Sequence, residues 1–176
     1  MTSTAPSMPK NPLKIVSGGQ TGVDRAALDA ALLLRIPCGG WCPSGRRAED
    51  GPIPEIYPLK EMTSPRYDVR TRENVADSDG TLILTDCDRS SGTLLTIRTA
   101  QRLDKPLLVL DFRQLLITDR QEQLNEWIEV NSISTLNVAG PRESTSPGIY
   151  SRSKSFLQTA LKPYSRPFGR TENTGR

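Results

Sequence analysis

The sequence contains no histidine, only three cysteines, few aromatic residues (5%) and no long apolar run. Without histidine, the chain lacks the side chain that most often carries acid-base chemistry at neutral pH and most often binds transition metals. No apolar run approaches the roughly 20 residues that cross a bilayer, so we expect a soluble protein. The net charge of +3 is too small to indicate a nucleic-acid or membrane surface. We therefore expect neither nucleic acid nor membrane as a partner.

The cysteines show neither the CxxC spacing of redox sites nor the spacing of a zinc site. Cys38 and Cys42 are four residues apart, and Cys87 is distant. An odd number of cysteines in a long chain without a signal peptide favours reduced thiols and a cytoplasmic location. We expect these thiols to be structural and expect no protein metal site.

The basic residues are mostly arginine: there are 17 arginines and 6 lysines. The guanidinium group offers five donors in a planar fork and binds phosphates and carboxylates well. This composition favours an anionic small molecule as the ligand, although ordinary solvated arginines would give the same count.

The order of apolar runs and helical patterns predicts an α/β protein. Short apolar runs without polar alternation, typical of strands buried on both faces, lie at residues 13–17, 80–85, 106–111 and 134–140. Helical spacing is found at 23–34, 68–76, 93–103, 120–130 and 147–161. We predict a single domain with a Rossmann-like, doubly wound parallel sheet in three layers.

The ends of the chain and one internal segment do not fit this alternation. Residues 1–12 and 163–176 are polar and are expected to be disordered tails, which leaves residues 13–162 as the ligand-binding domain. Residues 36–43 predict a further short strand. The proline-rich stretch that follows, to about residue 68, is expected to be a long functional loop.

The stretch "SGGQTGVDR", residues 17–25, connects the first strand to the first helix. Its glycines let the backbone turn closely and leave amide N–H groups beside the positive end of a helix dipole, which suits an anion. The alternative is a closed turn in which Thr21 and Asp24 cap the helix. The predicted ligand contacts in this turn are Gly18, Gly19, Gln20, Thr21, Gly22, Asp24 and Arg25.

Four further segments add candidate binding residues. A second strand-to-helix turn supplies Ser91, Gly92 and Thr93; the alternative is that these residues only cap the helix. A glycine-proline loop supplies Ser44, Gly45, Arg46 and Arg47; the alternative is that this loop is a solvated charged segment. Arg70 and Asn74 share a helix face, Asp79 precedes a strand, and a third turn carries Gly140, Arg142 and Ser144. We expect the three turns, at Gly19, Gly92 and Gly140, to meet at one arginine-lined hollow.

These blocks together resemble the molybdenum carrier (molybdenum cofactor carrier) protein family. The resemblance rests on "SGGQTGVDRAALDAA", "GGWCPSGRRAEDGPIP", "YDVRTRENVADSDGTLIL", "SSGTLLT" and "LNVAGPRES", in order over residues 13–162. This family is a Rossmann-like branch related to the cytokinin-activating (LOG, lysine-decarboxylase-like) phosphoribohydrolases. The resemblance implies a small homo-oligomer, a dimer or tetramer, that holds molybdenum cofactor (molybdopterin) in a positively charged pocket.

The hydrolase relatives carry a "GGxGTxxE" signature with a catalytic glutamate. Here Leu95 and Thr96 stand where that acid would be sought, and histidine is absent. We therefore expect binding without turnover and no catalytic residue. The alternatives are a nucleotide-processing hydrolase that uses Asp24, Asp79 or Glu49, and a regulatory domain that binds a nucleotide or whose turns are only architectural.

Overall fold

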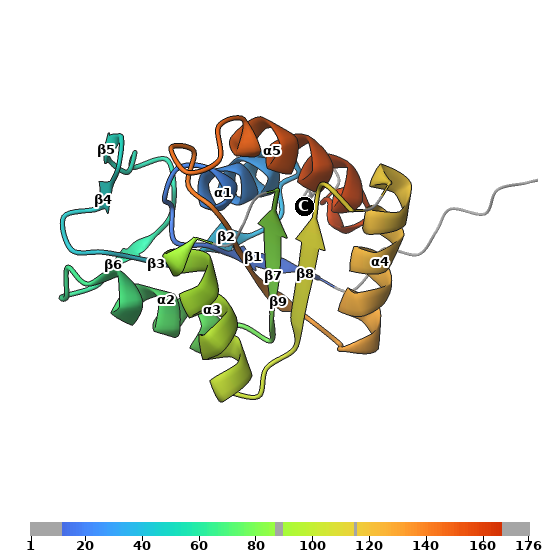
Figure 1. The fold of residues 1–176 in the computed structure, drawn as a ribbon, viewed down its shortest axis with the longest axis horizontal. Helices are drawn as coiled ribbons and strands as arrows, with labels where there is room; N and C mark the ends of the chain where they lie inside the picture. The colour runs from blue at the N-terminus through green and yellow to red at the C-terminus, as the bar shows by residue number, and fades with distance from the viewer. Residues whose placement is uncertain (1–11, 87–89, 115, 167–176) are drawn as a thin grey trace, which may run out of the picture.

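A computed structural model describes residues 12–86, 90–114 and 116–166. Its centre is a parallel five-stranded sheet with the order β2-β1-β9-β7-β8 (Figure 1). The strands are β1 (Lys14–Val16), β2 (Cys38–Gly39), β7 (Gly80–Thr85), β8 (Leu107–Asp111) and β9 (Thr135–Ala139). The predicted doubly wound α/β class is confirmed.

The sheet forms because its strands are apolar on both faces. All six residues of β7 are buried between β8 and β9, as its unbroken apolar run predicts. Pairing is in register along the strand, from Thr81 beside Leu107 to Thr85 beside Asp111. The segment expected to hold a further strand at 36–43 contains two, β2 and the separate β3 (Trp41–Cys42).

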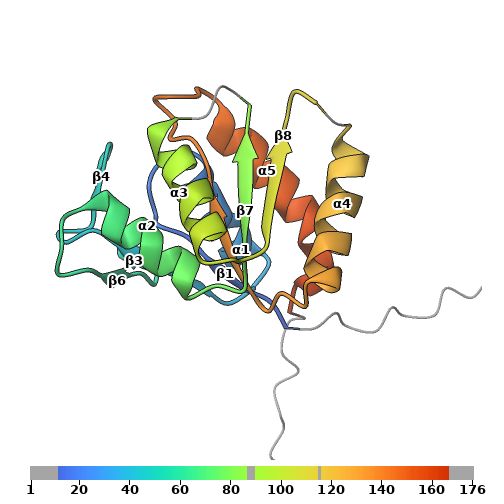
Figure 2. The same cartoon turned by 60° about the horizontal axis from the view of Figure 1, so that its bottom comes forward.

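Helices cover both faces of the sheet and make three layers (Figure 2). The helices α2 (Tyr67–Ala76) and α3 (Ser91–Arg102) lie on one face, and α1 (Val23–Leu33) and α5 (Ile149–Ala160) on the other. Helix α4 (Ile117–Val130) packs beside α5 and β8. The alanine-rich face of α1 is buried and lets α5 approach closely. None of the helices in the described ranges is both long and apolar enough to cross a bilayer.

The proline-rich excursion forms a peripheral segment, residues 43–66, which we call the strap. It contains the antiparallel ribbon of β4 (Arg47–Ala48) and β5 (Gly51–Pro52), and then β6 (Lys60–Glu61), which pairs in parallel with β3. Ile53 and Tyr57 of the strap pack with Leu28 and Cys42 in a small second core.

The folded unit reaches slightly beyond the expected limit at residue 162. A 3-10 helix, η1, spans Lys162–Tyr164, and Tyr164 is buried in the main core. The remaining residues of the predicted tails, 1–11 and 167–176, lie outside the described residues.

The order of the strands creates a crevice at one edge of the sheet. The chain moves outward from β1 to β2, and separately from β7 to β8, before β9 returns between β1 and β7. In open α/β sheets, ligands bind where the direction of strand order reverses, outside the carboxyl ends of the strands. Here that position lies over β1, β9 and β7.

Candidate functional site

A pocket of about 250 Å³ lies at this carboxyl edge. It is built by the turns after β1, β7 and β9 and by one face of α2. Its lining residues are Gly18, Gln20, Asp24, Tyr67, Arg70, Thr71, Asn74, Ser90, Ser91, Gly92, Leu95, Thr96, Asn137, Ala139, Gly140, Arg142, Ser144 and Thr145. The three turns therefore meet, as their position after parallel strands predicts.

The sequence-predicted residues fall into two groups. Those that line the pocket are Gly18, Gln20, Asp24, Arg70, Asn74, Ser91 and Gly92, together with Gly140, Arg142 and Ser144 of the third turn. Those that do not line it are Gly19, Thr21, Gly22, Arg25, Ser44, Gly45, Arg46, Arg47, Asp79 and Thr93.

The first turn is organised around an ion pair rather than around open amides. Arg70 Nη1 donates to Asp24 Oδ2 at 3.0 Å, and the two side chains are only 13% and 9% exposed. Burial raises the pKa of Asp24 above its ordinary 3.8, although the Arg70 charge and hydrogen bonds from the backbone amides of Gln20 and Gly18 act in the opposite direction. The chain's own carboxylate therefore occupies the anion position expected in this turn.

Gly18 is needed because Arg70 fills the space beside it. A Cβ atom at residue 18 would lie 1.4 Å from Arg70 Nη1. The Arg70 side chain also has a buried Nε with no hydrogen-bond partner in the described structure. A buried donor left unpaired costs about 1–3 kcal/mol, so Arg70 is short of acceptor oxygens.

The second turn is open towards the pocket. Ser90 caps α3, because its hydroxyl accepts from Thr93 N at 3.3 Å and lies 3.0 Å from the Thr93 hydroxyl. Thr93 is thus buried and used as part of the cap. Ser91 and Gly92, in the first turn of α3, are exposed and line the pocket. The positive end of the α3 dipole therefore faces it.

The third turn is fixed by a carboxylate from the strap. Glu49, between β4 and β5, accepts hydrogen bonds from the hydroxyls of Thr21 and Ser144 and from Ser144 N at 3.1 Å. Arg142 Nη1 lies 3.8 Å from Glu49 Oε2. We call this contact set the Glu49 bridge; it joins the turns after β1 and β9.

One face of α2 supplies a further wall. Tyr67, Arg70, Thr71 and Asn74 recur at helical spacing along it. The Asn74 side-chain amide is already used, because its Oδ1 accepts from Trp41 N at 2.7 Å and its Nδ2 donates to Trp41 O at 3.0 Å. Asn74 therefore lines the pocket while it holds β3 in place.

Four predicted contacts of the first turn face other parts of the molecule. Gly19 packs against the strap, where a Cβ atom would meet Leu59. Gly22 is the N-cap residue of α1 and makes no side-chain cap, so the structure does not show the alternative in which Thr21 and Asp24 cap this helix. Thr21, Gly22 and Arg25 line a second hollow of about 610 Å³, which Glu49 and Ser144 of the Glu49 bridge also line. Arg25 forms a two-point ion pair there with Asp50 at 3.0 and 3.2 Å.

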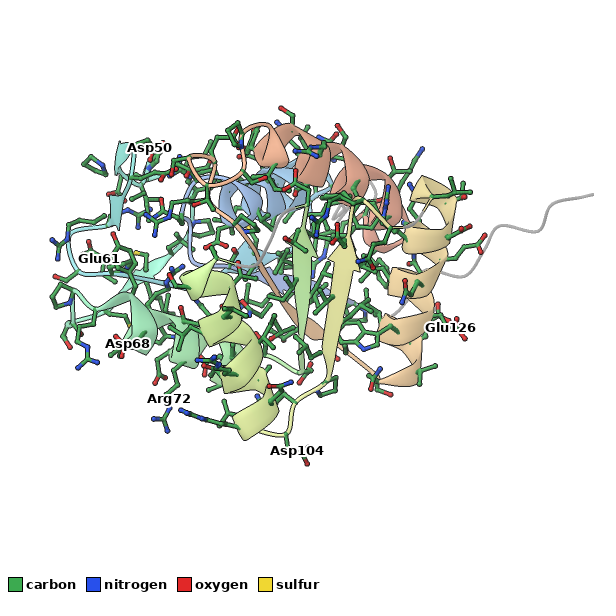
Figure 3. The ribbon with its side chains drawn as sticks, in the orientation of Figure 1. Asp50, Glu61, Asp68, Arg72, Asp104 and Glu126 are labelled. Carbon is green, nitrogen blue, oxygen red and sulfur yellow. The ribbon has the colours of Figure 1, made fainter. Side chains whose placement is uncertain are left out.

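The prediction that Arg46 and Arg47 neutralise a ligand does not agree with their positions. Arg46 donates to the carbonyl oxygens of Ile53, Pro54, Tyr57 and Leu59, at 2.9–3.3 Å, and so folds the strap. Arg47 is exposed on β4, and Ser44 and Gly45 form the turn before it. Figure 3 shows this ribbon, with Asp50 labelled, at the periphery of the molecule.

Asp79, which was predicted to contact the ligand, also lies away from the pocket. It precedes β7 and therefore lies at the amino edge of the parallel sheet, opposite the pocket. Its Oδ2 accepts from Ser134 N at 2.9 Å and from Thr135 N at 2.7 Å, which ties the start of β9 to β7. Asp79 therefore joins the ends of two strands and does not line the pocket.

The prediction missed several lining residues, and some of them had a signal. Tyr67 and Thr71 lie three residues before Arg70 and Asn74 on the same helix face. Asn137 is a single amide within the apolar strand β9 and is buried, with Nδ2 3.3 Å from Thr81 Oγ1. Thr145 follows the recognised third turn, whereas Ala139 carries no chemical signal.

The described residues show no cluster of three carboxylates or thiols that could hold a metal ion. Cys38 and Cys42 are free thiols; Cys42 is buried, and neither lines the pocket. Burial raises the pKa of both. Cys87 lies outside the described residues.

A parallel sheet with a polar pocket at its topological switch point defines an α/β protein of the Rossmann-like class. The family model "circularly permutated YpsA SLOG family" matches residues 15–161, and the chain belongs to this family. A crystal structure from Syntrophus aciditrophicus, named "Putative molybdenum carrier protein", is similar with 45% identity and a TM-score of 0.83, over 87% of this chain and 96% of that chain. This agrees with the family resemblance in the sequence. No curated protein matched significantly.

Proposed function

We propose that the protein binds and carries a small phosphorylated anion in the pocket, without converting it. The observation that carries this proposal is the meeting of the three turns at the switch point, where the amino end of α3, Arg70 and Arg142 face one cavity. Helix amino ends bind phosphate groups through their unpaired amides, and arginine adds charge-assisted hydrogen bonds.

Molybdenum cofactor is the first ligand to test, because the similar crystal structure is named as a molybdenum carrier. The phosphate of such a ligand suits the amino end of α3 and Arg142, which line the same pocket. The hydrogen-bonding groups of a pterin suit Gln20 and Asn137 in the walls. Any molybdenum would then be cargo carried by the ligand itself.

One observation favours a second candidate function, the hydrolysis of a nucleoside monophosphate. Of the three carboxylates considered from the sequence, Asp24 lines the pocket, whereas Asp79 lies at the opposite edge of the sheet and Glu49 behind the third turn. The ion pair with Arg70 occupies the Asp24 carboxylate, which favours binding over catalysis. Release of free base from AMP or GMP by the wild-type protein, abolished by Asp24→Asn, would replace the carrier proposal with this one.

The direct test is to identify what the protein carries. Protein purified without denaturation is examined by mass spectrometry and elemental analysis, and by light scattering for the proposed homo-oligomer. A co-purifying pterin with molybdenum supports the cofactor, whereas a nucleotide changes the ligand and keeps the binding function.

Titration with AMP and with adenosine then tests the site. Arg142→Ala should weaken AMP binding about tenfold, the low end for a hydrogen bond to a charged group, because Arg142 is half exposed. Arg72→Ala is the matched control, since Arg72 is exposed and points outward from α2 in Figure 3. Equal AMP affinity in the wild type and Arg142→Ala would contradict the proposed anion site.

A further inference from the structure

Each arginine of the pocket already faces a carboxylate of the chain itself. Arg70 is paired with Asp24 at 3.0 Å, and Arg142 lies 3.8 Å from Glu49. The side-chain charges of these four residues therefore balance to zero.

The two pairs differ in how readily a ligand can take over the arginine. The Asp24 pair is buried and has hydrogen-bonding geometry. The Arg142 side chain is 51% exposed, and its contact with Glu49 is longer than a charge-assisted hydrogen bond, so this pair is weak. Of the two arginines, Arg142 is therefore the one that an incoming anion can engage more readily.

Glu49 cannot move aside freely when this happens. Its carboxylate accepts from Thr21 and Ser144, and its own backbone N–H donates to Gln20 Oε1 at 2.9 Å. Although burial acts in the opposite direction, the hydrogen bonds from Ser144 and Thr21 hold the pKa of Glu49 below its ordinary 4.5, so the group is charged at neutral pH. An anion bound to Arg142 therefore meets a fixed negative charge.

We infer that Glu49, although it lies outside the pocket lining, is a specificity-determining residue that limits the negative charge of the ligand. This inference rests on the proposed function. Glu49 competes with the ligand anion for Arg142 and repels it as a like charge. Both effects weaken the binding of highly charged anions and leave the binding of the uncharged part of the ligand unchanged.

The test compares two probes with the same body, AMP and adenosine, by calorimetry. Glu49→Gln keeps the shape of the side chain and removes its charge. AMP affinity should rise about two- to fivefold, the size of one partly exposed charge interaction, while adenosine affinity stays unchanged. The gain should shrink at high salt. Glu55→Gln is the control, because Glu55 lies in the same strap but faces Arg46 at 3.5 Å and is 88% exposed.

A second variant separates charge from architecture. Thr21→Val removes one hydrogen bond to Glu49 and leaves its charge, so no selective gain for AMP is expected. If Glu49→Gln weakens AMP and adenosine equally, or leaves AMP affinity unchanged, Glu49 only holds the turns together and the inference is wrong. If the wild type binds neither AMP, phosphate nor molybdate, the proposed function itself fails.

Discussion

The turns after β1 and β7 have the same position in the fold but differ in the side chains that contact their backbone amides. Both lead from the carboxyl end of a buried strand into a helix, and both contain glycine beside hydroxyl residues. In the first turn, Asp24 lies against the backbone amides of Gly18 and Gln20 and holds Arg70. In the second, Ser90 supplies one cap, and Ser91 and Gly92 stay exposed at the pocket.

This difference shows that two similar glycine-containing turns can be filled in different ways: the chain places its own Asp24 in the first turn and leaves the helix end of the second turn open to the pocket. The first turn stabilises the pocket by positioning Arg70, and the second offers the open helix end. The first turn thus supports the pocket, and under the proposed function the second turn contacts the ligand, so mutations in the two turns should differ in the size and even in the sign of their effects.

The largest expected effect is the removal of the internal anion. Asp24→Ala leaves the Arg70 charge buried without its partner, which should lower the free energy of unfolding by about 3–5 kcal/mol. Ser90→Ala, the corresponding change at the second turn, removes only an N-cap and should cost about 1 kcal/mol. Urea unfolding of both variants measures the difference. Equal losses would mean that the turns are not specialised as described.

Glycine-to-alanine changes at the two turns should act in opposite directions. Gly18→Ala forces Arg70 away from Asp24 and should destabilise the protein by about 1–3 kcal/mol, as for a buried group left unpaired. A Cβ atom at Gly92 meets nothing within 4 Å, and alanine suits a helix better, so Gly92→Ala should stabilise by about 0.5–1 kcal/mol. Thermal unfolding of the two variants checks the signs. A stabilising Gly18→Ala would show that Arg70 does not need that space.

The fold could be predicted because its signals are local. The unbroken apolar run of β7 and the alanine-rich face of α1 indicate directly that these segments are buried. The alternation of strands and helices then predicts a parallel sheet. The small strands of the strap were not predicted, because they are two residues long and are held by the long-range contacts of Arg46.

The site could be predicted only in part, because the identity of a residue does not show which group its side chain contacts in the folded protein. Arg46 and Arg70 look equally suited to an anion in the sequence, yet one binds four carbonyl oxygens of the strap and the other lies in the pocket wall. Asp24 was assigned to ligand contact, and only the packing of α2 against the first turn shows that it pairs with Arg70. The α2 face was the most predictable part, because helical spacing fixes it.

The smallest expected effect is a difference in pH dependence between the two carboxylates. Burial raises the pKa of Asp24, so the folded state binds its proton more readily than the unfolded chain does. This proton-linked part of the stability is fully present below 3.8 and is lost as the pH rises through the higher folded pKa; the cost of leaving Arg70 without a partner in Asp24→Ala is a separate effect. Glu49 behaves in the reverse way: its folded pKa is lowered, so its contribution is present above 4.5 and is lost as the pH falls through the folded value.

Urea unfolding of the wild type, Asp24→Asn and Glu49→Gln at pH values from 7 down to 4 measures both contributions. On acidification, the stability of the wild type relative to Asp24→Asn should rise, because only the wild type can gain the buried proton. Its stability relative to Glu49→Gln should fall at the acidic end of the range. Slopes of the same sign would mean that the two carboxylates are held in the same way, and the distinction between a buried internal anion and a hydrogen-bonded outer bridge would be lost.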